Sequence, residues 1–284
     1  MPAISIVTDT DASLPAALAA EHQIRQVPIV VHFGSETFKT GEEIDDARLF
    51  DRINRENKLP TTAAPSPGQF VEAFQAAFDS GAATVICFCV SSAVSATYKA
   101  ALTAKEMLPG ADIEVVDTLT LSVAQGFVAL EAAEAVRAGA SKAEVLARAA
   151  EVGRRAHLYV ALPTLKYLAM SGRVGYVAAG LANVLNIQPV LTIRDGKLDM
   201  LERVRTRAKA WARVVELAET AAGGKPAERL AIVHVNALAE ARLIEEKLRA
   251  SVPVPPSTFF AELTPGLSVH SGAGLVGVAL VAGV

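Results

Sequence analysis

Hydroxyl side chains gather where three predicted strands end. They are Thr8 and Thr10, Ser91 and Ser92, and Thr118 and Thr120. Because ligands of parallel sheets bind outside the carboxyl ends of the strands, we expect these groups to lie near one site. Ser91, Ser92 and Ser95 lead directly into a predicted helix, whose unpaired N–H groups favour an anion such as a carboxylate or a phosphate. The residues alone leave open that these serines simply cap the helix, as serine commonly does.

Other chemistry finds little support in the sequence. The five histidines lack partners at zinc-ligand spacing, and no Gly-x-Ser-x-Gly nucleophile motif occurs. Gly272–Gly277 matches the dinucleotide-binding pattern letter for letter, but too few residues follow it to supply the helix and the ribose-binding acid. We therefore predict no metal, no cofactor and no catalytic residue.

Composition narrows the class of protein. Of the 284 residues 51% are hydrophobic and 20% are charged, and the net charge of -3 with scattered Lys and Arg argues against nucleic acid. Cys87 and Cys89 fall on one face of a strand, a poor geometry for a disulfide, which indicates a reduced, intracellular protein. The N-terminus does not resemble a signal peptide, and the uncharged stretch 266–284 is interrupted by His270 and glycines. We expect a cytoplasmic protein with no membrane segment.

The elements that would position the hydroxyls alternate regularly in the first half. Strands are predicted at 4–7, 26–33, 84–90 and 113–116, and helices at 14–21, 45–54, 69–80, 97–107 and 122–138. Asp11 or Ser13 is expected to cap the first helix, and the proline-rich segment 59–67 is expected to be a loop. This alternation predicts a parallel α/β/α domain.

The second half shows a different pattern. Helices are predicted at 142–155, 164–169, 208–222 and 239–251, and strands at 158–161, 188–193, 197–203, 229–235, 257–263 and 275–281. Asp195-Gly196 between two strands is a strong hairpin signal. The mixed order predicts an α+β domain with a mixed or antiparallel sheet, and we place the boundary between residues 1–153 and 154–284.

Motifs along nearly the whole chain resemble those of the DegV family. In order they are Ile6–Thr10, Thr62–Pro67, Ser91–Tyr98, Val115–Thr118, Leu168–Val174, Asn186–Leu191, Arg203–Thr206 and His270–Gly274. The resemblance implies a two-domain DegV-like fold with a fatty acid buried between the domains. It further implies the binding subunit of a bacterial fatty acid kinase, which presents the carboxylate to a separate ATP-dependent subunit for acyl phosphate formation.

By the same resemblance, Thr62 and a serine of the pair Ser91-Ser92 should hold the carboxylate. Spacing does not decide between the two serines; Ser92 is favoured, with Ser95 as a contributor at the helix start. Arg205 and His270 should lie near the pocket mouth.

Several positions depart from the family pattern or have another explanation. Ala63 replaces a serine, Ala96 a glycine and Ala273 a proline, and Thr40 stands where aspartate is common, which affects the expected head-group geometry. Read without the resemblance, Arg205 belongs to a solvated basic edge, His270 is a buried core residue, and Arg173 caps the helix before it. The alternative function is a stand-alone phosphotransferase or hydrolase that uses His270 and Arg205 on a small anion.

Overall fold

The computed structural model describes residues 3–173 and 187–284, so Val174 and Asn186 of two family-like motifs lie outside the described residues. The first half contains a parallel sheet in the order β2-β1-β6-β7. Its strands are β1 (Ile4–Asp9), β2 (Arg25–Val27), β6 (Thr84–Cys89) and β7 (Ile113–Asp117). The helices around it are η1 (Thr10–Ala12), α1 (Ala16–Glu21), α3 (Pro67–Asp79), α4 (Thr97–Glu106), α5 (Ser122–Arg137) and α6 (Lys142–Arg155).

Strand β6 forms the centre of this sheet because its side chains are apolar on both faces. Every residue of Thr84–Cys89 is buried, as expected for a parallel strand covered on both sides. Cys87 packs with α3 and α4 on one face, and Phe88 packs with α5 on the other. Both cysteines are free and buried.

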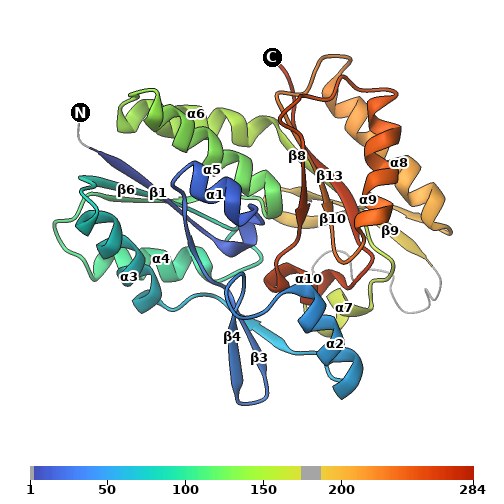
Figure 1. The fold of residues 1–284 in the computed structure, drawn as a ribbon, viewed down its shortest axis with the longest axis horizontal. Coiled ribbons are helices and arrows are strands. Elements are labelled where there is room, and N and C mark those ends of the chain that lie inside the picture. The colour runs from blue at the N-terminus through green and yellow to red at the C-terminus, as the bar shows by residue number, and fades with distance from the viewer. Residues whose placement is uncertain (1–2, 174–186) are drawn as a thin grey trace.

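The expected strand 26–33 is in fact two strands in two sheets. Pro28, which has no N–H to donate to a ladder, separates β2 from β3 (Val30–Phe33). Strand β3 joins β4 (Glu36–Lys39) and β5 (Thr61–Ala63) in a small antiparallel sheet of order β4-β3-β5, and α2 (Asp46–Glu56) lies beside it (Figure 1). Strand β4 was not predicted, and the predicted loop 59–67 contains β5.

The second half contains a mixed sheet in the order β10-β9-β8-β13-β11-β12, in which only β11 and β12 are parallel. Its strands are β8 (Ala156–Ala161), β9 (Gln188–Arg194), β10 (Lys197–Val204), β11 (Arg229–His234), β12 (Phe259–Glu262) and β13 (Val276–Val281). The helices are α7 (Lys166–Met170), α8 (Arg207–Ala222), α9 (Leu238–Arg249) and α10 (Pro265–Ser271). The predicted hairpin is confirmed: Asp195 and Gly196 join β9 to β10 with φ of 50° and 76°.

Helix α10 was not predicted from the sequence. Its N-cap is Thr264 and Pro265 occupies the first turn, where proline is tolerated. His270 therefore lies in the last turn of a helix.

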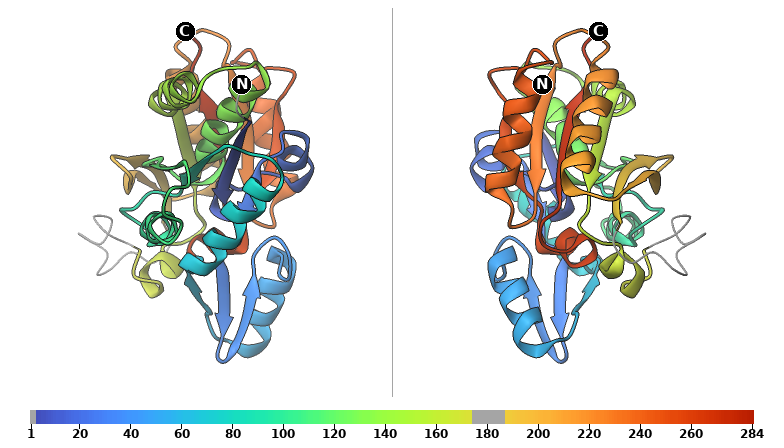
Figure 2. Two further views of the ribbon diagram at one scale, coloured as in Figure 1. Left: turned by 90° about the vertical axis from the view of Figure 1, so that its left-hand side faces the viewer. Right: turned by 90° about the vertical axis from the view of Figure 1, so that its right-hand side faces the viewer.

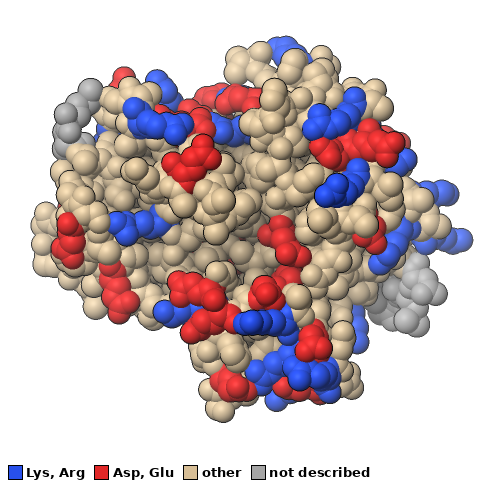
Figure 3. Space-filling view, viewed as in Figure 1, with Lys and Arg blue, Asp and Glu red and all other residues tan. Residues whose placement is uncertain are grey.

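The layers meet at α5, which is buried along most of its length between the two large sheets (Figures 1 and 2). Helices α8 and α9 cover the opposite face of the mixed sheet. On the face shown in Figure 3, acidic and basic side chains are interspersed. Within residues 3–173 and 187–284, no helix combines the length and the apolar character needed to cross a membrane.

Candidate functional site

A cavity of about 640 Å³ lies between the mixed sheet, the start of α5 and the loops after β1 and β6. This volume falls in the range of pockets that hold a small organic ligand. Much of its wall is aliphatic, including Leu121, Leu158, Val160, Leu191, Leu198 and Leu275. Leu158 and Val160 of β8 and Leu191 and Ile193 of β9 form the regular part of this wall, because side chains two apart on a strand share a face.

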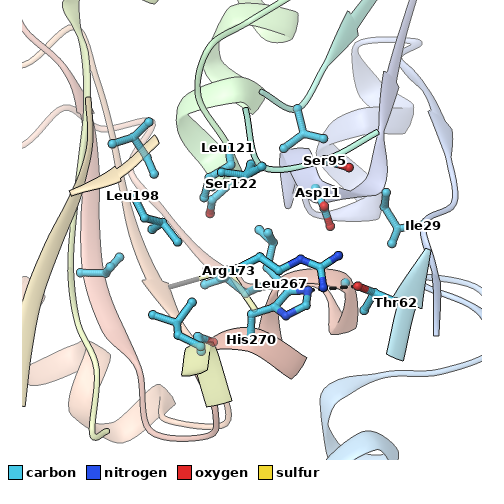
Figure 4. Close-up of a pocket in the computed structure, with 18 of the residues that line it drawn as sticks. Asp11, Ile29, Thr62, Ser95, Leu121, Ser122, Arg173, Leu198, Leu267 and His270 are labelled. Carbon is cyan, nitrogen blue, oxygen red and sulfur yellow. Dashed lines mark hydrogen bonds between the residues drawn. The ribbon is translucent and has the colours of Figure 1, made fainter. Parts of the chain in front are cut away.

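Polar side chains collect toward another side of the cavity (Figure 4). Thr62, on the short strand β5, reaches His270 on α10, with 3.0 Å between Thr62 Oγ1 and His270 Nε2. Strand β5 lies at the edge of its small sheet and pairs with β3, where Val31 lies opposite Thr62. The predicted carboxylate residue and one predicted mouth residue are thus in contact, although the sequence separates them by 208 positions.

His270 is neutral at ordinary pH in this site. Burial, and secondly the charge of Arg173, lower the pKa of its imidazole to about 4. Its Nδ1 atom is buried with no hydrogen-bond partner among the described residues. The ring therefore offers one proton, which either nitrogen can carry.

Arg173 adds a positive charge to the polar side of the cavity. As expected for a capping residue, its Nη1 atom donates to the carbonyl of Ser171 over 2.7 Å, just after α7. Its exposed side chain also lines the cavity near His270 and Thr62 (Figure 4). From its place after the predicted helix, Arg173 was expected to cap that helix, and nothing in the sequence predicted that it would line the cavity.

The serines in the turn after β6 differ in what they contact. Ser91 is fully buried, its hydroxyl donates to the Gly196 carbonyl over 2.8 Å, and it does not line the cavity. Ser92 and Ser95 do line it. The Ser95 hydroxyl is 2.8 Å from that of Thr97 and accepts from the Thr97 N–H, so it also serves the start of α4.

The backbone at this turn is less available to an anion than the sequence suggested. The Ser92 N–H donates to the carboxylate of Asp117, at 3.2 and 3.3 Å from its two oxygens. The Ala93 N–H donates to the Ser91 hydroxyl. Both amides are already engaged by side chains of the protein.

Arg205 lies elsewhere. It is exposed in the bend between β10 and α8, and it is not among the residues that line the cavity. Its position on the surface leaves it accessible to another molecule.

Asp11 and Ser122 also line the cavity and, like Arg173, were not predicted as site residues. Asp11 was expected, like Ser13, to cap the first helix; in fact α1 begins after Pro15 with no side-chain cap, and Asp11 faces the cavity. Ser122 opens α5 with φ of 56°, and its buried hydroxyl has no hydrogen-bond partner among the described residues. Neither position carried a motif that distinguished it from a capping residue.

The described residues contain no group of three or more His, Cys, Asp or Glu side chains that could hold a metal ion. The site therefore offers hydroxyls, a neutral imidazole, a carboxyl and a guanidinium beside an aliphatic wall. Such a site can orient an anionic head group while it buries an apolar body.

Comparison with known proteins gives matches over the whole chain. The model of the DegV family, described as a family of uncharacterised proteins, matches residues 3–283. A DegV domain-containing protein of Streptomyces coelicolor is 34% identical over 275 residues, which cover 97% of each chain. Protein DegV of Bacillus subtilis is 32% identical over 279 residues, covering 97% of this chain and 98% of the relative.

Solved structures agree with this fold. A fatty-acid-binding DegV family protein from Thermus thermophilus superimposes with a TM-score of 0.92 at 28% identity, covering 98% of this chain and 99% of its own. DegV from Bacillus subtilis, described as a fatty acid binding protein, gives a TM-score of 0.90 at 30% identity over 100% of both chains.

Proposed function

Because this chain belongs to the DegV family, we propose that it binds one long-chain fatty acid in the cavity between α5 and the mixed sheet. The observation that carries the proposal is the division of the cavity into an aliphatic wall and a cluster of hydrogen-bonding groups. The fatty-acid binding described for the Thermus and Bacillus proteins supports it.

The aliphatic wall provides the driving force. Removing a methylene group from water contributes about 0.8 kcal/mol, so the chain of a long fatty acid has ample drive even after the costs of ordering. The head group then needs orientation rather than much additional affinity.

Thr62 is suited to hold the carboxylate. When His270 carries its proton on Nε2, this N–H donates to Thr62 Oγ1, and the Thr62 O–H is left to donate to a carboxylate oxygen. Arg173 supplies a positive charge nearby, and Ser92 and Ser95 supply further hydroxyls. Ser91 is set aside because its hydroxyl is committed to the Gly196 carbonyl.

The polar side is also the accessible one, since Arg173 and Ser92 are exposed. A carboxylate held there can be reached by a second protein, and the exposed Arg205 is available to contact it. We therefore propose that this cytoplasmic protein is a non-catalytic carrier that presents the carboxylate to an ATP-dependent fatty acid kinase subunit, which forms the acyl phosphate.

The first test is the ligand itself. Protein purified from a bacterial host should release fatty acid on organic extraction, identified by mass spectrometry, and added hexadecanoate should raise the melting temperature of delipidated protein. Empty extracts together with an unchanged melting temperature would overturn the proposal.

The second test separates a carrier from the alternative enzyme. Delipidated protein incubated with ATP and hexadecanoate should form no acyl phosphate, and incubated with an acyl phosphate should not hydrolyse it. Turnover that is lost in His270→Ala would instead favour a stand-alone phosphotransferase or hydrolase.

A further inference from the structure

Asp11 is a buried carboxyl that faces the proposed head-group site. Its residue is 6% exposed, and it lines the same cavity as Thr62, Arg173 and His270 (Figure 4). A side-chain carbon added at Gly266 would lie 2.4 Å from Asp11 Oδ1, so the carboxyl packs directly against the backbone of α10.

The fold makes little use of this carboxyl. Asp9, two residues earlier, accepts hydrogen bonds from the Val90 N–H at 2.8 Å, the Asp11 N–H at 3.0 Å and the Gln125 side chain at 3.1 Å. The hydrogen bond that Asp11 accepts comes from Thr264 at 3.5 Å, and that hydroxyl lies closer to the Thr10 carbonyl, at 3.1 Å. The carboxylate of Asp9 is occupied by hydrogen bonds within the fold, whereas the carboxyl of Asp11 can still form hydrogen bonds with a ligand.

Charge decides in which form Asp11 can accompany a fatty acid. Arg173 balances one negative charge, and His270 is neutral. Two ionised carboxylates beside each other in a buried site repel strongly, and such pairs share one proton. A ligand carboxylate at Thr62 therefore favours the neutral form of Asp11.

Resting on the proposed function, we propose that Asp11 is a head-group ligand that donates its carboxyl O–H to the fatty-acid carboxylate. The proton comes from solvent when Asp11 is ionised in the empty protein, so that binding then takes up one proton for each fatty acid. One oxygen of the ligand carboxylate accepts a hydrogen bond from the Asp11 O–H, and the carboxylate also accepts one from the Thr62 hydroxyl.

The surroundings of Asp11 support this protonation. Burial raises the pKa of Asp11 well above its ordinary range and the charge of Asp9 adds to the rise, while the Thr264 hydroxyl and Arg173 oppose it. Among the elements packed around Asp11, α5 contributes the uncharged Gln125, which bonds to Asp9, and α10 contributes the neutral His270. Asp46 of α2 accepts a hydrogen bond from Ser268 on the same helix α10. Bound fatty acid raises the Asp11 pKa further, so affinity must fall as the pH rises above the Asp11 pKa of the empty protein.

The test measures hexadecanoate affinity from pH 6 to pH 10, at concentrations below micelle formation, for wild type and three variants. Wild-type affinity should fall by up to tenfold per pH unit over part of this range. Asp11→Asn keeps a donor but cannot ionise, so its affinity should stay near the highest wild-type value at every pH. Asp11→Ala should also lose the pH dependence, at about tenfold lower affinity.

Asp46→Asn is the matched control, because Asp46 is a buried acid that contacts α10 but does not line the cavity. It should keep the wild-type slope, and hexadecanol, which has no carboxylate, should bind wild type without that slope.

A wild-type affinity that is constant over the whole range, a slope that persists in Asp11→Asn, or loss of binding in Asp11→Asn would each overturn the role of Asp11. Absence of hexadecanoate binding by wild type at any pH would instead contradict the fatty-acid function itself.

Discussion

The two sides of the cavity are built in different ways. Much of the aliphatic wall repeats along neighbouring strands of one sheet, with Leu158 and Val160 on β8 and Leu191 and Ile193 on β9. The polar side combines Asp11, Thr62, Arg173 and His270, each from a different and short segment. Affinity can thus come from a regular pattern that tolerates exchange of one aliphatic residue for another, while orientation depends on a few polar groups that separate segments bring together.

The largest expected effect concerns the aliphatic wall. Lengthening the ligand from dodecanoate to hexadecanoate adds methylene groups that each contribute about 0.8 kcal/mol, so affinity should rise by on the order of a hundredfold. Competition with a fluorescent fatty acid measures this series. The matched fatty alcohols should show the same increment, and an affinity independent of chain length would remove the wall as the source of binding.

The second effect concerns Asp46, which bonds to the helix α10 that carries His270. Ser268 of α10 donates to the Asp46 carboxyl over 2.8 Å, and burial raises the pKa of Asp46 to about 8 from an ordinary 3.8. Between these values the folded protein retains a proton that the unfolded chain has released, so stability must fall as the pH rises, by about 1 kcal/mol per pH unit. Above pH 8 this contribution levels off.

Urea unfolding of wild type and Asp46→Asn from pH 5 to pH 9 measures this dependence. Asp9, whose pKa burial raises to about 6, and Asp11, whose pKa burial also raises, have the same sign and should leave a smaller slope in the variant. Equal slopes in the two proteins would show that Asp46 does not titrate in this range.

The third effect isolates one head-group contact. Thr62→Val removes the hydroxyl while keeping the shape, and should weaken hexadecanoate binding by about tenfold or more, because a hydrogen bond to a charged group is lost. Thr61→Val is its control, since Thr61 is exposed on the same strand and points to the opposite face. Similar losses in both variants would point to a disturbed β5 rather than a lost contact.

The smallest effect separates the two serines. Ser91→Ala removes the hydrogen bond to the Gly196 carbonyl and should lower stability by about 1 kcal/mol while affinity stays nearly constant. Ser92→Ala should do the reverse, weakening hexadecanoate binding a few-fold with little change in melting temperature. The opposite assignment would return Ser91 to the site.

The sequence predicted the elements whose signals are local. The strand at β6, the helix at α3 and the Asp195-Gly196 hairpin are all confirmed. Strand β4 was missed because Glu36–Lys39 is largely exposed and lacks apolar alternation. Helix α10 was missed because Pro265–Ser271 contains residues of low helix propensity, and tertiary contacts such as Ser268 with Asp46 hold it in place.

The candidate site was predicted only in part, because several of its contacts join residues that are far apart in the sequence and have no local signal. Thr62 and His270 were expected from the order of motifs, and the structure brings them together. Ser91 could not be distinguished from Ser92, because the carbonyl that engages Ser91 lies 105 residues away in sequence. Asp11 carried a plausible local explanation as a helix cap, and only the approach of α10 gives it another role. The domain boundary near residue 153 stays a prediction.

The distance in sequence between Thr62 and His270 has a consequence for how the protein forms. Their hydrogen bond closes a loop of 208 residues, and contacts of such separation form late because the chain entropy of closure must first be overcome. Neither residue can meet the other until β5 and α10 are both in place. A ligand that requires this contact therefore binds only molecules that have completed folding. The rate at which the ligand binds during refolding would report the rate of the final folding step.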